Sequence, residues 1–150
     1  MAGSDDLSDL DYRRLLTLRT RLRGFIHWSE AQAKQAGLSP AQHQLLLAVR
    51  GHDHPAGPTI GELADYLYVR HHSAVGLVRR CDATGLVTRF PDDLDGRVVR
   101  VRLTARGHQA LRDLSRLHME ELRRLASHLQ PLLAGLDVGQ ADHGGSKPAA

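Results

Sequence analysis

The chain has 150 residues, 41% hydrophobic and 25% charged, which suffices for one compact globular unit and is short for two. Its net charge is +3, and 18 of its 20 basic residues are arginine. The planar guanidinium group of arginine suits contacts to phosphate and guanine, but a GC-rich genome also favours arginine over lysine. A single cysteine excludes an internal disulfide, no apolar run is long enough to span a membrane, and residues 1–11 are acidic and unlike a signal peptide, so we expect a cytoplasmic protein.

The first predicted element is a long helix over residues 8–36. Acidic residues crowd its first turn, and Gly37 suits the position after its end. Ser39 and Pro40 then open a capping box that starts a second helix, which ends near Arg50. The apolar stripe of the first helix consists of Leu15, Leu18, Leu22, Phe25, Ser29 and Ala33.

Two short helices joined by a tight turn follow. Thr59 and Glu62 form a capping box for the first of them, and a turn over residues 68–70 leads to the second, which ends at Gly85. This order predicts a helix-turn-helix. The predicted buried positions are Ile60, Leu63, Ala64 and Leu67 in the first helix and Ala74, Leu77, Val78 and Cys81 in the second.

A β-hairpin and a last long helix complete the chain. Residues 87–90 are strand-like, residues 91–96 form a turn-rich tip, and residues 99–103 alternate apolar and arginine side chains. Thr104 caps the last helix, within which Pro131 predicts a kink or a division. Its apolar stripe includes Leu111, Leu114, His118, Leu122, Leu125 and Leu129.

These elements predict a mainly α fold with a small β-hairpin wing: a winged helix-turn-helix domain flanked by long N- and C-terminal dimerisation helices. A small central domain cannot cover both terminal stripes, so we expect a homodimer. We divide the chain into an N-terminal dimerisation helix (1–37), the DNA-binding region (38–107), C-terminal dimerisation helices (108–138) and a disordered tail (139–150).

The outward face of the second short helix carries the first set of candidate DNA-binding residues. No acid occurs between Tyr66 and Cys81, which suits a groove lined by phosphates, although a solvated charged face has the same composition. Arg79 offers a fork to guanine and Val75 a contact to the thymine methyl group. The predicted face comprises Arg70, His71, His72, Ser73, Val75, Gly76 and Arg79.

The hairpin carries the second set. Residues 97–106 contain four arginines and no acid. Arg97 follows the tip and suits a narrow minor groove, and Asp95 is placed to hold its guanidinium group. Arg100 is expected to point away from the core and to join the DNA surface. The helix then takes the major groove of double-stranded DNA and the wing takes the adjacent minor groove.

At this point the sequence resembles the multiple-antibiotic-resistance regulator (MarR) family. The resemblance rests on residues 95–107 (DGRVVRVRLTARG), on residues 59–64 (TIGELA) and on residues 85–87 (GLV). It implies an obligate dimer that binds a pseudopalindromic operator, usually as a repressor that a small ligand or an oxidant releases. Arg79 and Cys81 depart from the family, which often has Asp and Leu at these places.

A ligand site is expected between the dimer helices and the DNA-binding region. Four side chains are candidates for it: His27, Trp28, His43 and His118. The mixture of rings suits a small aromatic acid, whereas the alternative is that these side chains belong to the core or to the dimer interface. The histidine spacings predict no metal site, and we assign no cofactor.

An enzyme is not expected, because the sequence has no glycine-rich phosphate loop, nucleophile elbow or metal-binding helix pair. Two alternatives to a ligand-responsive repressor stay open. One is a winged helix that binds proteins rather than DNA, and the other is a metal-responsive regulator.

Overall fold

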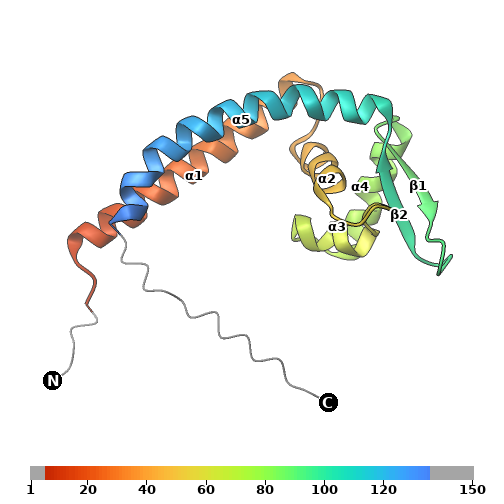
Figure 1. The fold of residues 1–150 in the computed structure, drawn as a ribbon, viewed down its shortest axis with the longest axis horizontal. Coiled ribbons are helices and arrows are strands. Elements are labelled where there is room, and N and C mark those ends of the chain that lie inside the picture. Colours follow the sequence, from red (N-terminus) through yellow and green to blue (C-terminus); the bar gives the residue numbers. More distant parts are fainter. Residues whose placement is uncertain (1–5, 136–150) are drawn as a thin grey trace, which may run out of the picture.

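The computed structural model describes residues 6–135 as two long helices that form an arm and a compact lobe at one end of it (Figure 1). The predicted disordered tail, 139–150, lies outside the described residues. No helix in the described part has the length and apolar character needed to cross a membrane. The elements, in chain order, are α1 (Asp9–Gln35), α2 (Pro40–Gly51), α3 (Ile60–Leu67), α4 (His71–Ala83), β1 (Val87–Pro91), β2 (Val99–Leu103) and α5 (Ala105–Ala134).

Side-chain caps set the starts of four of the five described helices. Ser8, Ser39 and Thr59 each accept a hydrogen bond from the backbone N–H three residues on, in complete capping boxes, and Thr104 accepts one from Gly107. The predicted caps are therefore confirmed. Helix α4 differs, because it begins after Arg70 without any side-chain cap.

The core of the lobe is built from α2, α3, α4, the hairpin and the first turns of α5. Leu45, Leu63, Val78 and Val101 are fully buried there. Burial of Cys81 raises the pKa of its thiol to about 11, so this group is inert at neutral pH. The predicted buried faces of α3 and α4 are confirmed, except that Leu67 is only partly buried.

The hairpin is anchored to the start of α3. Strands β1 and β2 pair antiparallel, with Val87 opposite Leu103. The backbone N–H of Val101 donates to the carbonyl of Pro58 at 3.0 Å, and Thr59 forms a β-bridge with β2. Gly57 has φ +88°, and a β-carbon there would collide with the Val101 carbonyl, so the close approach of loop and strand requires glycine.

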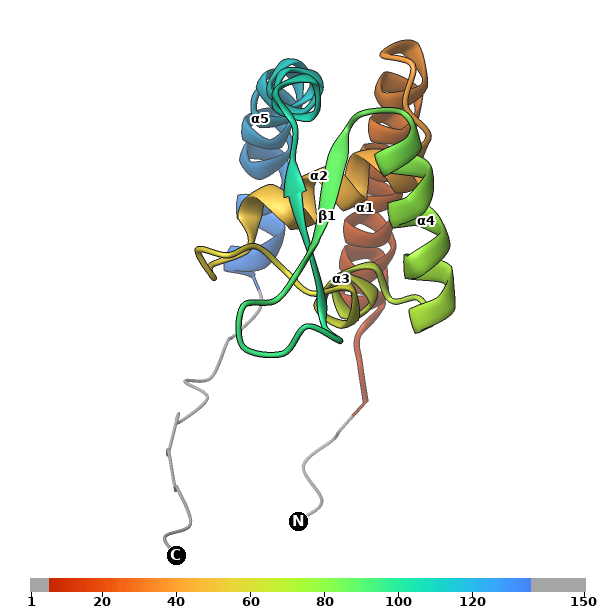
Figure 2. The same ribbon diagram turned by 90° about the vertical axis from the view of Figure 1, so that its right-hand side faces the viewer.

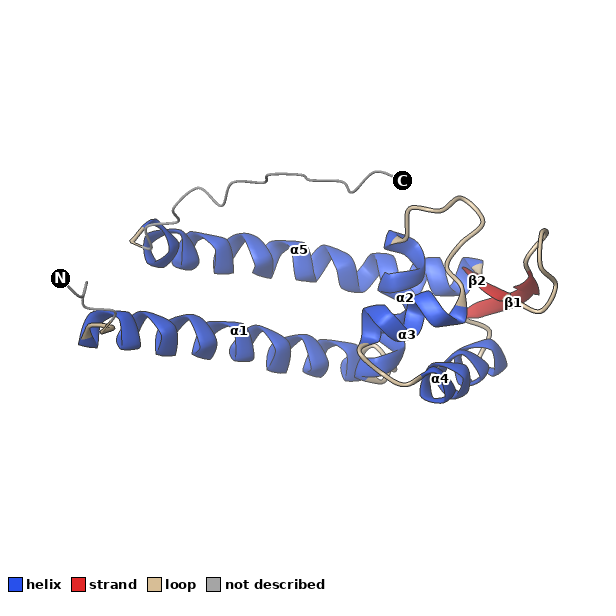
Figure 3. Cartoon of the chain, turned by 90° about the horizontal axis from the view of Figure 1, so that it is seen from below, coloured by secondary structure: helices blue, strands red, loops and turns tan. Residues whose placement is uncertain are grey.

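Helices α1 and α5 run antiparallel, side by side, in the arm (Figures 1 and 3). Pro131 does not divide the last helix as one of the two predicted outcomes had it, because α5 is one helix that continues through Pro131 to Ala134. Proline at this position removes a single backbone hydrogen bond near the helix end. Leu133 lines a small cavity together with Leu15 and Leu18 of α1, so apolar contact with α1 supports the last turn.

Candidate nucleic-acid interface

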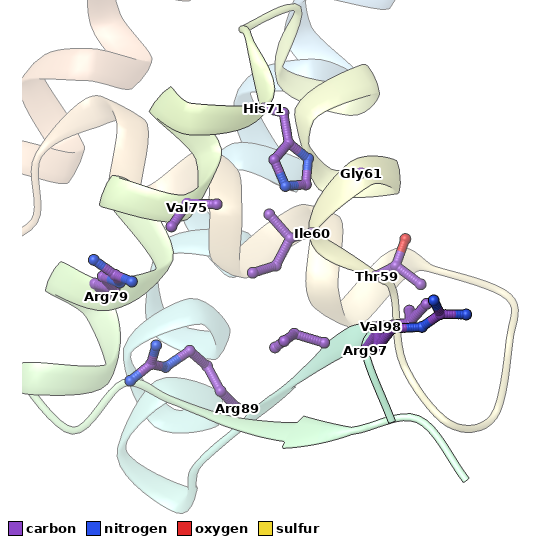
Figure 4. Close-up of a pocket in the computed structure, with 10 residues that line it drawn as sticks. Thr59, Ile60, Gly61, His71, Val75, Arg79, Arg89, Arg97 and Val98 are labelled. Atoms are coloured by element: carbon purple, nitrogen blue, oxygen red, sulfur yellow. The ribbon is translucent and has the colours of Figure 1, made fainter. Parts of the chain in front are cut away.

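A groove of about 420 Å³ lies between α4, the start of α3 and the hairpin (Figure 4). Figure 2 shows α4 and the hairpin on the same face of the lobe. Arginines stand at both ends of the groove over an apolar floor, and none of the ten residues that line it is acidic. They are Thr59, Ile60, Gly61, His71, Val75, Arg79, Arg89, Arg97, Val98 and Val99.

Helix α4 supplies one wall of this groove. His71, Val75 and Arg79 follow one another along it, at the spacing that places side chains on one helix face. The remaining candidate residues, on α4 and at its N-cap, do not line the groove. Arg70, His72 and Ser73 are exposed, and Gly76 is half-buried.

The hairpin supplies the opposite wall. The side chain of Arg97 is 94% exposed, and its Nε donates to Oδ1 of Asp95 at 3.3 Å. The same oxygen accepts the backbone N–H of Arg97 at 3.1 Å. The predicted Asp95–Arg97 pair is therefore confirmed, and it holds an exposed guanidinium group at the end of the groove.

Arg100 is the exception among the predicted DNA-facing residues. Its side chain is only 14% exposed; its Nε donates to Asp92, and its Nη1 donates to the Gly57 carbonyl at 2.7 Å. The hydrogen bond from Arg100 is the main reason why the pKa of Asp92 lies below its ordinary value. The expectation that Arg100 points outward is wrong, because the loop before α3 approaches β2 and offers its carbonyl to this side chain.

Arg89 is a residue of the groove that the sequence interpretation did not select. Its Nε donates to Oδ2 of Asp82 at 2.8 Å, which fixes the guanidinium group near the C-terminal end of α4. In Figure 4, Arg89 and Arg79 lie at one end of the groove and Arg97 at the other. Strand alternation places Arg89 on the same side of β1 as the buried Val87, and this position was the local sign that its side chain faces the lobe.

Three of the four ligand-site candidates come together where α1, α2 and α5 meet. The rings of Trp28 and His118 have centroids 4.9 Å apart, and those of His43 and His118 are 4.7 Å apart. His27 does not belong to this cluster, because it is exposed on another face of α1. Phe25 joins the cluster instead, with its ring 6.0 Å from that of His118.

The hydrogen bonds of His118 define its tautomer. Nδ1 lies 2.7 Å from the Leu114 carbonyl, which only accepts, so Nδ1 carries the proton. In the neutral ring, Nε2 then accepts from the hydroxyl of Ser29 at 2.6 Å. Burial, with a smaller contribution from His118, lowers the pKa of His43 below 6.5. The unfolded chain then takes up this proton more readily, so acidification below pH 6.5 weakens folding at this position.

The order of elements and the groove between α4 and the hairpin define a winged helix-turn-helix protein. Residues 36–98 of the chain match the MarR family. No curated protein sequence gave a significant match.

Solved structures share the fold at low sequence identity. AbsC, a MarR family transcriptional regulator from Streptomyces coelicolor, is 19% identical, with a TM-score of 0.64 over 87% of this chain and 97% of its own. Wild-type MarR from E. coli is 23% identical, with a TM-score of 0.66 over 87% and 92%. A variant of S. aureus MepR bound to an oligodeoxyribonucleotide is 19% identical, with a TM-score of 0.61 over 83% and 86%.

Proposed function

We propose that this protein is a cytoplasmic, dimeric transcription regulator that binds a pseudopalindromic operator in double-stranded DNA. The observation that carries the proposal is the acid-free groove, in which Arg79 of the recognition helix α4 and Arg97 of the wing stand on opposite walls. In this arrangement α4 enters the major groove and the wing reaches the adjacent minor groove. The oligonucleotide bound to the MepR variant supports DNA as the partner.

Selection from a random duplex pool, followed by titration at several salt concentrations, tests the proposal. We expect a steep fall of affinity with salt, because each phosphate contact releases counterions. Arg97→Ala should weaken binding to all sequences and reduce the salt slope by about one. Arg112→Ala, which removes the same charge from an exposed position outside the groove, should not. Weak binding with a flat slope would instead support a winged helix that binds proteins.

The arm supports dimerisation. Large apolar side chains are exposed along both of its helices, among them Leu16 at 68%, Ile26 at 52% and Met119 at 50%. Exposed apolar side chains along two neighbouring helices are typical of a protein–protein interaction surface. Light scattering should give the mass of two chains, and Leu16→Arg should lower the mass or weaken the dimer. A stable, folded wild-type monomer would contradict this part of the proposal.

We also propose that the regulator is a repressor that a small aromatic acid releases, with the ring cluster of Trp28, His43 and His118 as the binding site. The support is its composition and its place at the junction between the arm and the lobe. A panel of phenolic and other aromatic acids should contain at least one that raises the melting temperature and lowers operator affinity. His118→Ala should abolish both responses, and His27→Ala should preserve them. If no acid of the panel changes the melting temperature or the operator affinity of the wild type, the ligand-binding part of the proposal is wrong.

A further inference from the structure

Tyr68 has an unusual backbone for its residue type. It ends α3 in the left-handed region, with φ 53° and ψ 42°. Among residues 6–135 it is the one residue other than glycine with positive φ. The three remaining positions of this kind are Gly37, Gly57 and Gly85. A large side chain disfavours this conformation because its β-carbon crowds the backbone, so folding alone would favour glycine or asparagine here.

The side chain of Tyr68 gains nothing from the described part of the chain that would offset this strain. It is 97% exposed, and its hydroxyl and ring have no partner within residues 6–135. Tyr66, two residues earlier, shows the contrast. Its hydroxyl lies 3.0 Å from Nδ1 of His52, and the two rings pack edge to face at 5.9 Å.

Tyr68 lies close in the chain to the proposed DNA-binding groove. It stands three residues before His71, the first residue of α4 and a wall residue of the groove. The turn that contains it is exposed through Arg70, and no acid occurs between Tyr66 and Cys81. A strained residue with an unpartnered polar tip, placed where the chain enters the recognition helix, points to an external partner.

We propose that Tyr68 is a positioning residue for DNA, whose phenolic O–H donates to a phosphate oxygen beside the groove that α4 enters. The inference rests on the proposed function. It adds an uncharged contact to the DNA backbone that fixes the position of α4 along the duplex. Backbone contacts of this kind set the orientation of a protein on the duplex without reading bases. Leu94, at the wing tip, is equally exposed but has no hydrogen-bonding group.

Tyr68→Phe tests the hydroxyl group on the duplex obtained by selection. We expect the affinity to fall about tenfold, as for loss of one hydrogen bond to a charged acceptor. The slope of affinity against salt should stay at the wild-type value, because no charge is removed, whereas Arg97→Ala changes it. Tyr66→Phe is the matched control, which loses a hydroxyl bonded to His52 and should bind as the wild type does.

Tyr68→Gly separates a DNA contact from a structural role. It removes the ring and relieves the backbone, so the melting temperature should equal or exceed that of the wild type while affinity falls at least as far as in Tyr68→Phe. A lower melting temperature, or wild-type affinity in both variants, would overturn the inference while leaving the proposed function intact. Failure of the wild type itself to bind any duplex would overturn both.

Discussion

The wing and the recognition helix present arginine in two different ways. In the wing and its strands, Arg89, Arg97 and Arg100 are each paired with an aspartate. On α4, Arg79 and Arg80 have no acidic partner within residues 6–135. Most arginines of the hairpin are therefore held by ion pairs within the hairpin or to the end of α4, whereas Arg79 and Arg80 of α4 are not paired with a carboxylate in the described part of the chain.

This difference separates two contributions to DNA binding: the fixed position of an arginine side chain and the electrostatic attraction of its charge to phosphate. An arginine held by a neighbouring carboxylate loses little side-chain freedom on binding, but part of its charge is neutralised. An unpaired arginine attracts phosphate more strongly and must be ordered by the duplex. In the proposed DNA complex, we therefore expect α4 to contribute most of the long-range attraction to the phosphates. We expect the wing mainly to place Arg97 in the minor groove.

Arg100→Ala should give the largest effect, and it should act on stability. Removing this side chain breaks the bonds to Asp92 and to the Gly57 carbonyl, which join the wing to the loop before α3. We expect the free energy of unfolding to fall by about 2 kcal/mol in chemical denaturation. Arg102→Ala, on the same strand but exposed over the ring of Phe90, should cost about 0.5 kcal/mol. If both variants lose the same free energy of unfolding, the bonds of Arg100 do not stabilise the attachment of the wing to this loop.

Arg79→Ala should have the next largest effect, on DNA affinity. If α4 reads bases, the loss should be about 2 kcal/mol and confined to one or two base pairs, which competition with operator variants measures. Arg80→Ala, on the same helix but outside the groove, should weaken all sequences alike. If both variants lose the same affinity for every operator sequence, α4 attracts the phosphates but does not distinguish base pairs.

Asp95→Asn should have the smallest effect, but its sign is decisive. The change adds positive charge to the wing, which by attraction alone raises affinity. It also releases the guanidinium group of Arg97, and if placement matters more, affinity should fall about threefold. Asp93→Asn makes the same charge change at an exposed site and should raise affinity slightly. A rise in both variants would remove the distinction between wing and helix.

Most of the fold was predictable from local signals. Capping residues such as Ser39 and Thr59 marked helix starts, and Gly37 and Gly85 marked helix ends, because these roles depend on a few neighbouring residues. The winged helix-turn-helix then followed from the order of the elements. The Asp95–Arg97 pair was equally local, since its partners are two residues apart.

Contacts between distant segments were not predictable from the sequence. Strand alternation placed Arg100 outside, but a carbonyl 43 residues earlier in the chain turns its side chain inward. Arg89 was missed because its part in the groove depends on the packing of β1 beside the end of α4. Three members of the ring cluster were predicted, but Phe25 was missed. His27 was wrongly included, because it is exposed on another face of α1.

Helix α5 belongs to both the arm and the lobe, and its 30 residues form a rod about 45 Å long. Gly107 sits so close to the Leu86 carbonyl that no side chain fits there, and Thr104 donates to the Gly85 carbonyl at 2.5 Å, which fastens this rod to the segment leaving α4. Such a rod acts as a lever. A tilt of about 5° displaces its far end by about 4 Å, more than the base-pair rise of about 3.4 Å. In the proposed dimer, a small change in the tilt of α5 would be enough to move the two DNA-binding lobes out of register with the two halves of the operator.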